Sequence, residues 1–296
     1  MKINIKRFLR SLLPVVLLLP ALFACDNRTD TKPSLAVTIA PQKYLLERIV
    51  GDRFDIVTLL SASADPETYD PSVSSLMGLQ KSEIFFRVGT LGFEQASLGK
   101  IAESSPDLKI VNCSVGIPLA EGTHGGRNGY DPHVWTSVRN ARIMAKNMYE
   151  ALVQQHPKDK EYFRHRYELL DRDLASMDST IAVMLTPSKG ESFVIRHPSL
   201  TYFANDYGLR QVSLELNGKE PTPAQMKQRL DEVRDSKASL FFIEKGHSSY
   251  ATRNIATTLN LPVTEISLLD YDWKENMLNV ARAVAAAAPD STRSGK

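Results

Sequence analysis

Three things are scarce in this sequence: net charge, cysteine and long apolar runs. Its 296 residues include 36 Lys and Arg against 34 Asp and Glu, and only 2 Cys. Residues 1–24 contain four basic residues and no acidic one, so the remainder has 32 basic against 34 acidic residues and a net charge of −2. Because no basic surface is indicated, we expect no nucleic-acid partner, and a small ligand or another protein instead.

The apolar run near the start, from Leu12 to Ala24, has 13 residues and is interrupted by two prolines. A transmembrane helix needs about 20 apolar residues, so a permanent membrane span is not expected. Basic residues precede the run and Cys25 follows it, which is typical of a signal peptide over residues 1–24. The segment from Leu22 to Cys25 resembles the bacterial lipobox, whose cysteine is acylated and becomes the mature N-terminus. The alternative is a plain secretory signal with an incidental cysteine.

An acylated Cys25 predicts a protein anchored to the lipid bilayer of the bacterial cell envelope, outside the cytoplasm and facing the periplasm if the cell is Gram-negative. Residues 25–33 are polar and are expected to form a flexible tether. Asp26 resembles a signal for retention in the inner membrane, but the sequence leaves the choice between inner-membrane and outer-membrane anchoring open. With Cys25 acylated, Cys113 has no partner for an intrachain disulfide and is expected to be a small buried apolar residue.

Short apolar strand candidates alternate with helix candidates along the rest of the chain, which predicts an α/β fold with parallel sheets. We expect two lobes, residues 34–157 and 187–290, each with a mostly parallel sheet flanked by helices, and a tail at 291–296. The strand candidates are Leu35–Ile39, Phe54–Leu60, Glu83–Val88, Leu108–Cys113, Phe193–Ile195, Gln211–Leu216, Ser239–Glu244 and Pro262–Ile266.

Between the lobes, residues 158–186 are predicted to form one long linking helix. Residues 158–185 contain no Gly or Pro, and apolar residues recur at alternating spacings of four and three from Phe163 to Met184. A rigid helix touching both lobes would leave a cleft between them for a ligand. A coiled-coil dimer seam would give the same spacing and is the alternative to the monomer that we expect.

Three other helices have signals at their ends. Thr222 and Gln225 form a capping-box pattern around Pro223, and Asp272 with Glu275 repeats that pattern. Pro41 is expected to open a helix that Gly51 ends.

Two similar turns and one isolated histidine are the segments best suited to chemistry. The turns run from Asp65 to Pro71 and from Tyr130 to Trp135, and each contains an Asp-Pro pair that fixes the direction of the next side chain. Glu67, His133 and His197 are the candidate metal ligands in these segments. Structural readings stay open for each: a solvated carboxylate for Glu67, a surface or core histidine for His133, and a capping or core histidine for His197. One carboxylate and two imidazoles suit Zn²⁺ and, less exclusively, Mn²⁺ or Fe²⁺.

With these motifs in order, the chain resembles the cluster A-I substrate-binding proteins of bacterial metal ABC transporters, the zinc and manganese family that includes ZnuA-type lipoproteins. The resemblance covers about residues 34–290. It implies two lobes joined by a long helix, a metal ion held between them, and an ABC permease as membrane partner. The matching segments are Asp65-Pro66 with Tyr69 and Pro71, Gly51–Arg53, Phe86–Gly89, Leu91–Glu94, Asp131–Trp135, His197 with Tyr202-Phe203 and Tyr207–Leu209, Glu220-Pro221, and Phe242–Glu244.

The chain departs from the family pattern at the ligand positions. Members usually have histidine where Glu67 stands, and an aspartate in the segment that here reads Ile266-Ser267-Leu268-Leu269. The fourth ligand therefore stays open between Asp270, Glu244, Ser267 and water. The loop before Asp131, often histidine-rich in zinc members, here contains only His124, which is read as a solvated loop residue or a transient metal-capturing one.

Two other functions are alternatives to metal capture. A metal-dependent hydrolase could use two histidines, one glutamate and water, but the sequence has no His-Glu-x-x-His and no Gly-x-Ser-x-Gly motif. We therefore expect no enzyme. A surface adhesin or a binder of a metal complex is the third possibility, and a lone protein-coordinated metal ion in the cleft would count against it.

Overall fold

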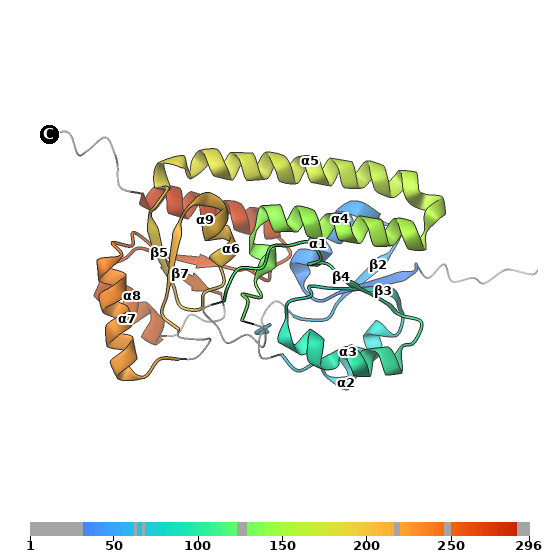
Figure 1. Ribbon diagram of the computed structural model, residues 1–296, viewed down its shortest axis with the longest axis horizontal. Helices are drawn as coiled ribbons and strands as arrows, with labels where there is room; N and C mark the ends of the chain where they lie inside the picture. The colour runs from blue at the N-terminus through green and yellow to red at the C-terminus, as the bar shows by residue number, and fades with distance from the viewer. Residues whose placement is uncertain are drawn as a thin grey trace, which may run out of the picture. The chain divides into compact units, whose positions relative to one another are not determined.

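The computed structural model (Figure 1) describes residues 32–61, 64–66, 69–122, 129–215, 220–245 and 250–288. The predicted signal peptide with Cys25, the ligand candidate Glu67, the loop residue His124 and the tail at 291–296 lie outside the described residues.

Within the described part of the chain, eight strands form two four-stranded sheets in which every pairing is parallel. The strand order is β2-β1-β3-β4 in the first sheet and β6-β5-β7-β8 in the second. The predicted α/β class is confirmed, and each expected strand is present with ends shifted by at most three residues. The strands are β1 Ser34–Val37, β2 Asp55–Thr58, β3 Ser82–Arg87, β4 Lys109–Asn112, β5 Ser192–Ile195, β6 Arg210–Ser213, β7 Phe241–Glu244 and β8 Val263–Ile266.

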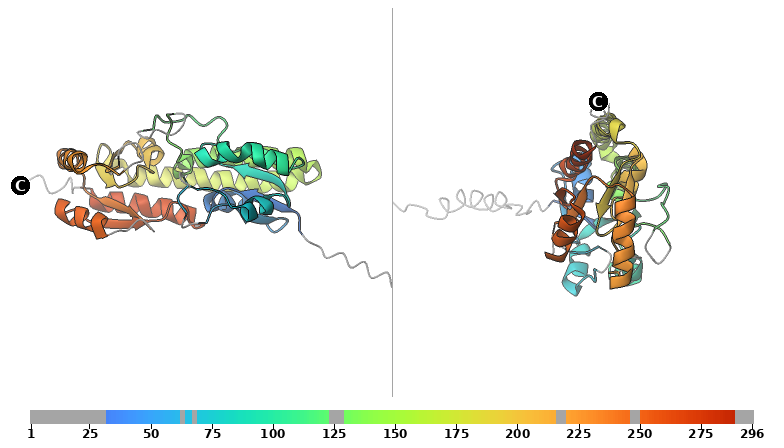
Figure 2. Two further views of the ribbon diagram at one scale, coloured as in Figure 1. Left: turned by 90° about the horizontal axis from the view of Figure 1, so that it is seen from below. Right: turned by 90° about the vertical axis from the view of Figure 1, so that its left-hand side faces the viewer.

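Helices lie on both sides of the strands in each sheet, as Figures 1 and 2 show. This covering explains why the inner strands are apolar on both faces: Leu35, Ala36 and Val37 of β1 and all of β5 are buried, whereas the edge strand β2 alternates in exposure. The α-helices are α1 Ala40–Val50, α2 Val73–Leu79, α3 Gly92–Ser104, α4 Val138–Gln155, α5 Lys160–Met184, α6 Thr201–Tyr207, α7 Pro223–Asp235, α8 Tyr250–Leu259 and α9 Trp273–Ala287. No helix among the described residues is both long enough and apolar enough to span a membrane.

The predicted linking helix is confirmed as α5, which runs past both sheets (Figure 1). It packs against α1 and α4 of the first lobe and against α9 of the second. Its predicted apolar stripe is buried at Phe163, Leu170, Leu174, Met177 and Ile181. Because the chain's own helices cover this stripe, it is not available as the seam of a coiled-coil dimer.

Two of the predicted helix ends are confirmed. Thr222 Oγ1 accepts the Gln225 backbone N–H while the Gln225 side chain bonds back to Thr222, forming the capping box at the start of α7. Gly51 follows α1 with φ of +62°, and a Cβ there would lie 2.3 Å from Tyr162 Oη. Glycine is therefore required by both the backbone angle and the close approach of α5.

Two other local predictions were wrong. Asp272 precedes α9 but makes no side-chain cap bond, because its ψ of 46° is not the extended conformation in which a cap side chain turns back to the helix. The sequence also predicts one helical run from Val134 to Leu152, opened by His133, but this run is broken at Ser137. A short 3-10 turn, Val134–Thr136, ends there, and Ser137 Oγ caps α4 by accepting the Asn140 N–H at 3.0 Å.

The point where the strand order reverses in the first sheet, between β1 and β3, is filled by a buried glutamate. Glu94, only 1% exposed, accepts bonds from the Thr38 hydroxyl and from the backbone N–H groups of Val88 (2.8 Å) and Gly89 (2.7 Å). Burial raises the pKa of this carboxyl, against the lowering effect of these bonds. Glu94 therefore ties together the ends of β1 and β3.

Glu94→Ala is expected to lower the free energy of unfolding by about 3 kcal/mol, because it leaves two buried donors and one partly buried donor without their acceptor. Urea denaturation followed by circular dichroism measures this. Glu103→Ala, on the exposed side of the same helix, is the control and should change stability by less than about 0.5 kcal/mol. Equal effects of the two substitutions would show that the Glu94 bonds do not stabilise the sheet.

Candidate metal centre

His133 is held in place by the aspartate of its own turn. Asp131 Oδ1 lies 2.9 Å from His133 Nδ1 and also accepts the His133 backbone N–H at 2.8 Å. Both side chains are buried, at 1% exposed for Asp131 and 3% for His133. Burial raises the pKa of Asp131, but its interactions with His133 and Thr201 outweigh that effect and hold the pKa below the usual range. The ring of His133 also packs on Trp135, with ring centres 5.2 Å apart.

His197 has the same kind of support from the other lobe. It follows β5, and its Nδ1 lies 2.9 Å from Oε2 of Glu215, which follows the neighbouring strand β6. His197 is 18% exposed and Glu215 13%. Each histidine thus has its Nδ1 beside a carboxylate. A neutral ring that donates its Nδ1–H in this way carries its lone pair on Nε2, which is the usual arrangement for histidines that bind metal.

The structure brings the two predicted histidines together from opposite lobes. Their ring centres are 5.1 Å apart, with the ring planes at 74° to each other. His197 stands at the carboxyl end of β5, beside the reversal point between β5 and β7 in the second sheet. Ligands of open α/β sheets bind at such points.

Bonds between loops fix the His133 turn relative to both sheets. Thr90, in the loop after β3, donates its hydroxyl to the Pro132 carbonyl at 2.6 Å. The Tyr202 hydroxyl of α6 donates to the Asp131 carbonyl at 2.7 Å, so the turn is also bonded to the second lobe. Burial raises the pKa of Tyr202 to about 12, so the phenol stays a proton donor at neutral pH.

The electrostatic surroundings of the two rings favour a cation. Asp131 and Glu215 contribute two negative charges, and Arg196, whose Nε lies 3.0 Å from Glu215 Oε1, contributes one positive charge. With neutral imidazoles the cluster has a net charge of −1 before a metal ion arrives. A divalent cation there would be attracted, and an anion would be repelled.

The other ligand candidates are not assembled with the histidines in the described structure. Among the described residues, no third His, Cys, Asp or Glu forms a metal-binding cluster with His133 and His197. Glu244 accepts a hydrogen bond from Ser199, and Asp270 accepts one from the Tyr271 backbone N–H at 2.8 Å. Ser267 is partly exposed in the loop after β8. Glu67 lies outside the described residues, and its ligand role stays a prediction.

Sequence reasoning missed the groups that orient the rings. From the sequence, Asp131 is predicted only as part of a turn, and neither Glu215 nor Arg196 has a predicted role. A signal for Glu215 existed, since it is a lone acid between Leu214 and Leu216 at the end of a predicted strand. Its pairing with His197, however, depends on which strands are neighbours in the sheet.

Two tryptophans join the His133 turn to the second lobe. The Trp135 indole N–H donates to the Leu268 carbonyl at 3.1 Å, in the loop where the family pattern has an aspartate. The Trp273 indole N–H donates in turn to the Trp135 carbonyl at 2.8 Å. Both side chains are 2% exposed. From the sequence, Trp135 is expected to shield His133 from water, and its hydrogen bonds also help to hold the lobes together.

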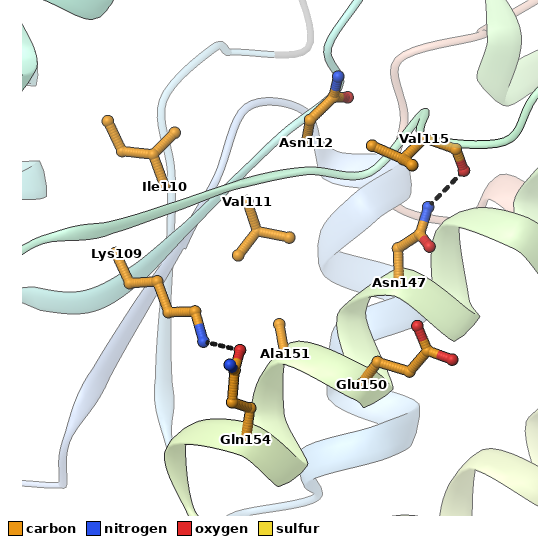
Figure 3. Close-up of a pocket in the computed structure, with 9 residues that line it drawn as sticks. All are labelled: Lys109, Ile110, Val111, Asn112, Val115, Asn147, Glu150, Ala151 and Gln154. Carbon is orange, nitrogen blue, oxygen red and sulfur yellow. Dashed lines mark hydrogen bonds between the residues drawn. The ribbon is translucent and has the colours of Figure 1, made fainter.

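A separate pocket lies elsewhere in the first lobe. It measures about 490 Å³ and lies between the edge strand β4 and α4, where Lys109 bonds to Gln154 and Asn147 bonds to the Val115 carbonyl (Figure 3). Neither His133 nor His197 lines it.

Comparison with known proteins agrees with this arrangement. The family model described as "ZnuA: Zinc-uptake complex component A periplasmic" matches residues 35–287. The chain belongs to this family. A crystal structure of ZnuA superimposes with a TM-score of 0.81 at 28% sequence identity, covering 87% of this chain and 100% of that one.

Relatives of the ZnuA-family chain differ in the metal that their names give. This chain is 26% identical over 298 residues to the zinc-binding lipoprotein AdcA of Streptococcus pneumoniae, and the alignment covers 92% of this chain and 58% of AdcA. It is 28% identical over 207 residues to the manganese-binding lipoprotein MntA of Halalkalibacterium halodurans, covering 68% of this chain and 67% of MntA. These relatives therefore do not distinguish zinc from manganese.

Proposed function

We propose that this ZnuA-family protein captures a divalent transition metal ion, most readily Zn²⁺, outside the cytoplasm and delivers it to an ABC permease. The observation that carries the proposal is the pairing of His133 and His197 from opposite lobes, with ring centres 5.1 Å apart and each Nδ1 beside a carboxylate. Family membership supports the transport role, and the names of AdcA and MntA support a metal as cargo.

In this proposal Glu67 and His133 bind the ion from the first lobe and His197 binds it from the second. The fourth position belongs to water or to an oxygen ligand such as Asp270 or Glu244. Two imidazole ligands favour Zn²⁺. A glutamate in place of a third histidine reduces the difference in affinity between Zn²⁺ and the alternatives Mn²⁺ and Fe²⁺. Acylated Cys25 anchors the protein to the bilayer, beside the permease.

Closure around the ion is a small movement in this mechanism. α5 contacts helices of both lobes, and the tryptophan bonds already join the His133 turn to the loop after β8. Binding then reorders side chains and loops around a nearly formed pair of histidines, without a wide hinge.

We expect the purified, untagged protein to bind one Zn²⁺ ion and to prefer Zn²⁺ over Mn²⁺ and Fe²⁺ in competition. Metal analysis gives the stoichiometry, and calorimetric titration of each metal, then of Mn²⁺ into zinc-loaded protein, gives the order of affinity. A higher affinity for Mn²⁺ would reassign the cargo. Absence of tight binding for all three metals would overturn the proposed function.

A further inference from the structure

Among the described residues, two side chains that matter for the site, His197 and Arg196, contact different carboxylate oxygens of Glu215. Oε2 lies 2.9 Å from His197 Nδ1, and Oε1 lies 3.0 Å from Arg196 Nε. The proposed function uses His197 as a metal ligand but gives Arg196 no role. We propose that Arg196 is a positioning residue that sets the metal affinity of the site by holding Glu215 against His197; this inference rests on the proposed function.

The backbone holds Arg196 and Glu215 side by side. β5 pairs with β6 in parallel, and the hydrogen bonding continues past the strand ends: Leu214 N–H donates to the Ile195 carbonyl and Glu215 N–H to the Arg196 carbonyl, both at 3.0 Å. The side-chain pair therefore spans two residues already joined by a main-chain bond. This arrangement limits the rotamers from which Glu215 can reach His197.

Burial makes a cationic partner necessary for Glu215. At 13% exposed, its carboxylate has lost most of its water, and a charge in that position is costly unless it is paired. Arg196 is 31% exposed and supplies the compensating charge. The guanidinium has a second acidic neighbour, Glu220, at 3.7 Å, but that side chain is 76% exposed and competes weakly through solvent.

Without Arg196, the carboxylate of Glu215 would be drawn toward water and would leave His197 less firmly oriented. Glu215 is the group that bonds directly to the ligand, and removing such a group typically lowers metal affinity by about 10–100-fold. Arg196 acts one contact further out, through Glu215, so its removal should have an effect at the lower end of that range. We therefore expect Arg196→Met to weaken Zn²⁺ binding by about 10-fold and to speed release of the ion. Arg196→Lys, which keeps the charge but not the planar fork, should recover part of the loss.

The experiment compares Zn²⁺ affinity and Co²⁺ absorption spectra in the full-length chain and four variants: Arg196→Met, Arg196→Lys, Glu215→Gln and the double variant Arg196→Met/Glu215→Gln. Arg142→Met is the matched control, because Arg142 makes a similar ion pair with Asp171 at 2.7 Å on α4 and α5. Its affinity and spectrum should equal those of the unsubstituted chain.

If Arg196 acts through Glu215, Arg196→Met weakens binding and alters the Co²⁺ bands, but adds little once Glu215 is Gln. Unchanged affinity and spectrum in Arg196→Met would overturn the inference, as would effects that simply add in the double variant. If Arg196→Met does not fold, the same comparison is made with Arg196→Lys, as a single substitution and combined with Glu215→Gln. Failure of the unsubstituted chain to bind Zn²⁺ would instead overturn the proposed function, and this inference with it.

Discussion

His133→Ala is expected to lower Zn²⁺ affinity by about 100-fold or more while the protein stays folded. The substitution removes an imidazole that Asp131 holds in the metal-binding tautomer and that lies 5.1 Å from the ring of His197. Binding would then depend on ligands from the second lobe and on Glu67. Calorimetric titration with Zn²⁺ measures the loss, and thermal unfolding of the metal-free variant checks that the fold survives.

The matched control is His165→Ala, which removes an exposed histidine from α5. Its Zn²⁺ affinity should equal that of the unsubstituted chain, which excludes a general effect of histidine loss. Unchanged affinity in His133→Ala would remove this residue from the site. A loss of equal size in both variants would show that zinc binds at no single site.

The fold could be predicted from the sequence because its signals are local. Short β-branched and aromatic runs such as Phe241–Glu244 form strands whose two faces are both covered, and the 3.6-residue period from Phe163 to Met184 forms a helix that buries one side. Helix ends were less predictable. The sequence around Asp272 carries a capping pattern, but the backbone conformation there, which the sequence does not reveal, decides whether the side chain caps.

The candidate site could be predicted only in part. His133 and His197 stood out because a proline beside each fixes its turn, but they come from segments 64 residues apart and only the packing of the lobes brings them together. The same holds for their partners. Glu215 lies beside His197 because β5 and β6 are neighbours, and strand neighbours do not follow from local patterns.

The lobe junction was the least predictable feature. The sequence indicated that α5 links the lobes, but not that α9 packs against α1 as well. Asp173 of α5 pairs with Arg48 of α1 and with Lys274 of α9, at 3.3 and 2.6 Å. Each of these partly exposed ion pairs adds little stability. The apolar contacts and the buried tryptophans therefore contribute more of the free energy that holds the lobes together.

Trp273→Ala is therefore expected to lower the free energy of unfolding by about 4 kcal/mol, a typical value for removing a buried aromatic side chain. Trp273 is 2% exposed, packs 6.0 Å from Tyr44 of α1 and donates its indole N–H to the Trp135 carbonyl. Urea unfolding of the metal-free protein measures the change. Leu169→Ala, at a 46% exposed position of α5, is the control and should cost less than about 0.5 kcal/mol.

Trp273→Phe separates the hydrogen bond from the packing. Phenylalanine keeps most of the apolar contact with Tyr44 but leaves the buried Trp135 carbonyl without its donor, which should cost about 1–2 kcal/mol. Because Trp135 packs on His133, that loss should also reach the metal site and weaken Zn²⁺ binding modestly. If Trp273→Phe is as stable as the unsubstituted chain while Trp273→Ala is not, packing alone joins the lobes here and the indole bonds contribute nothing measurable.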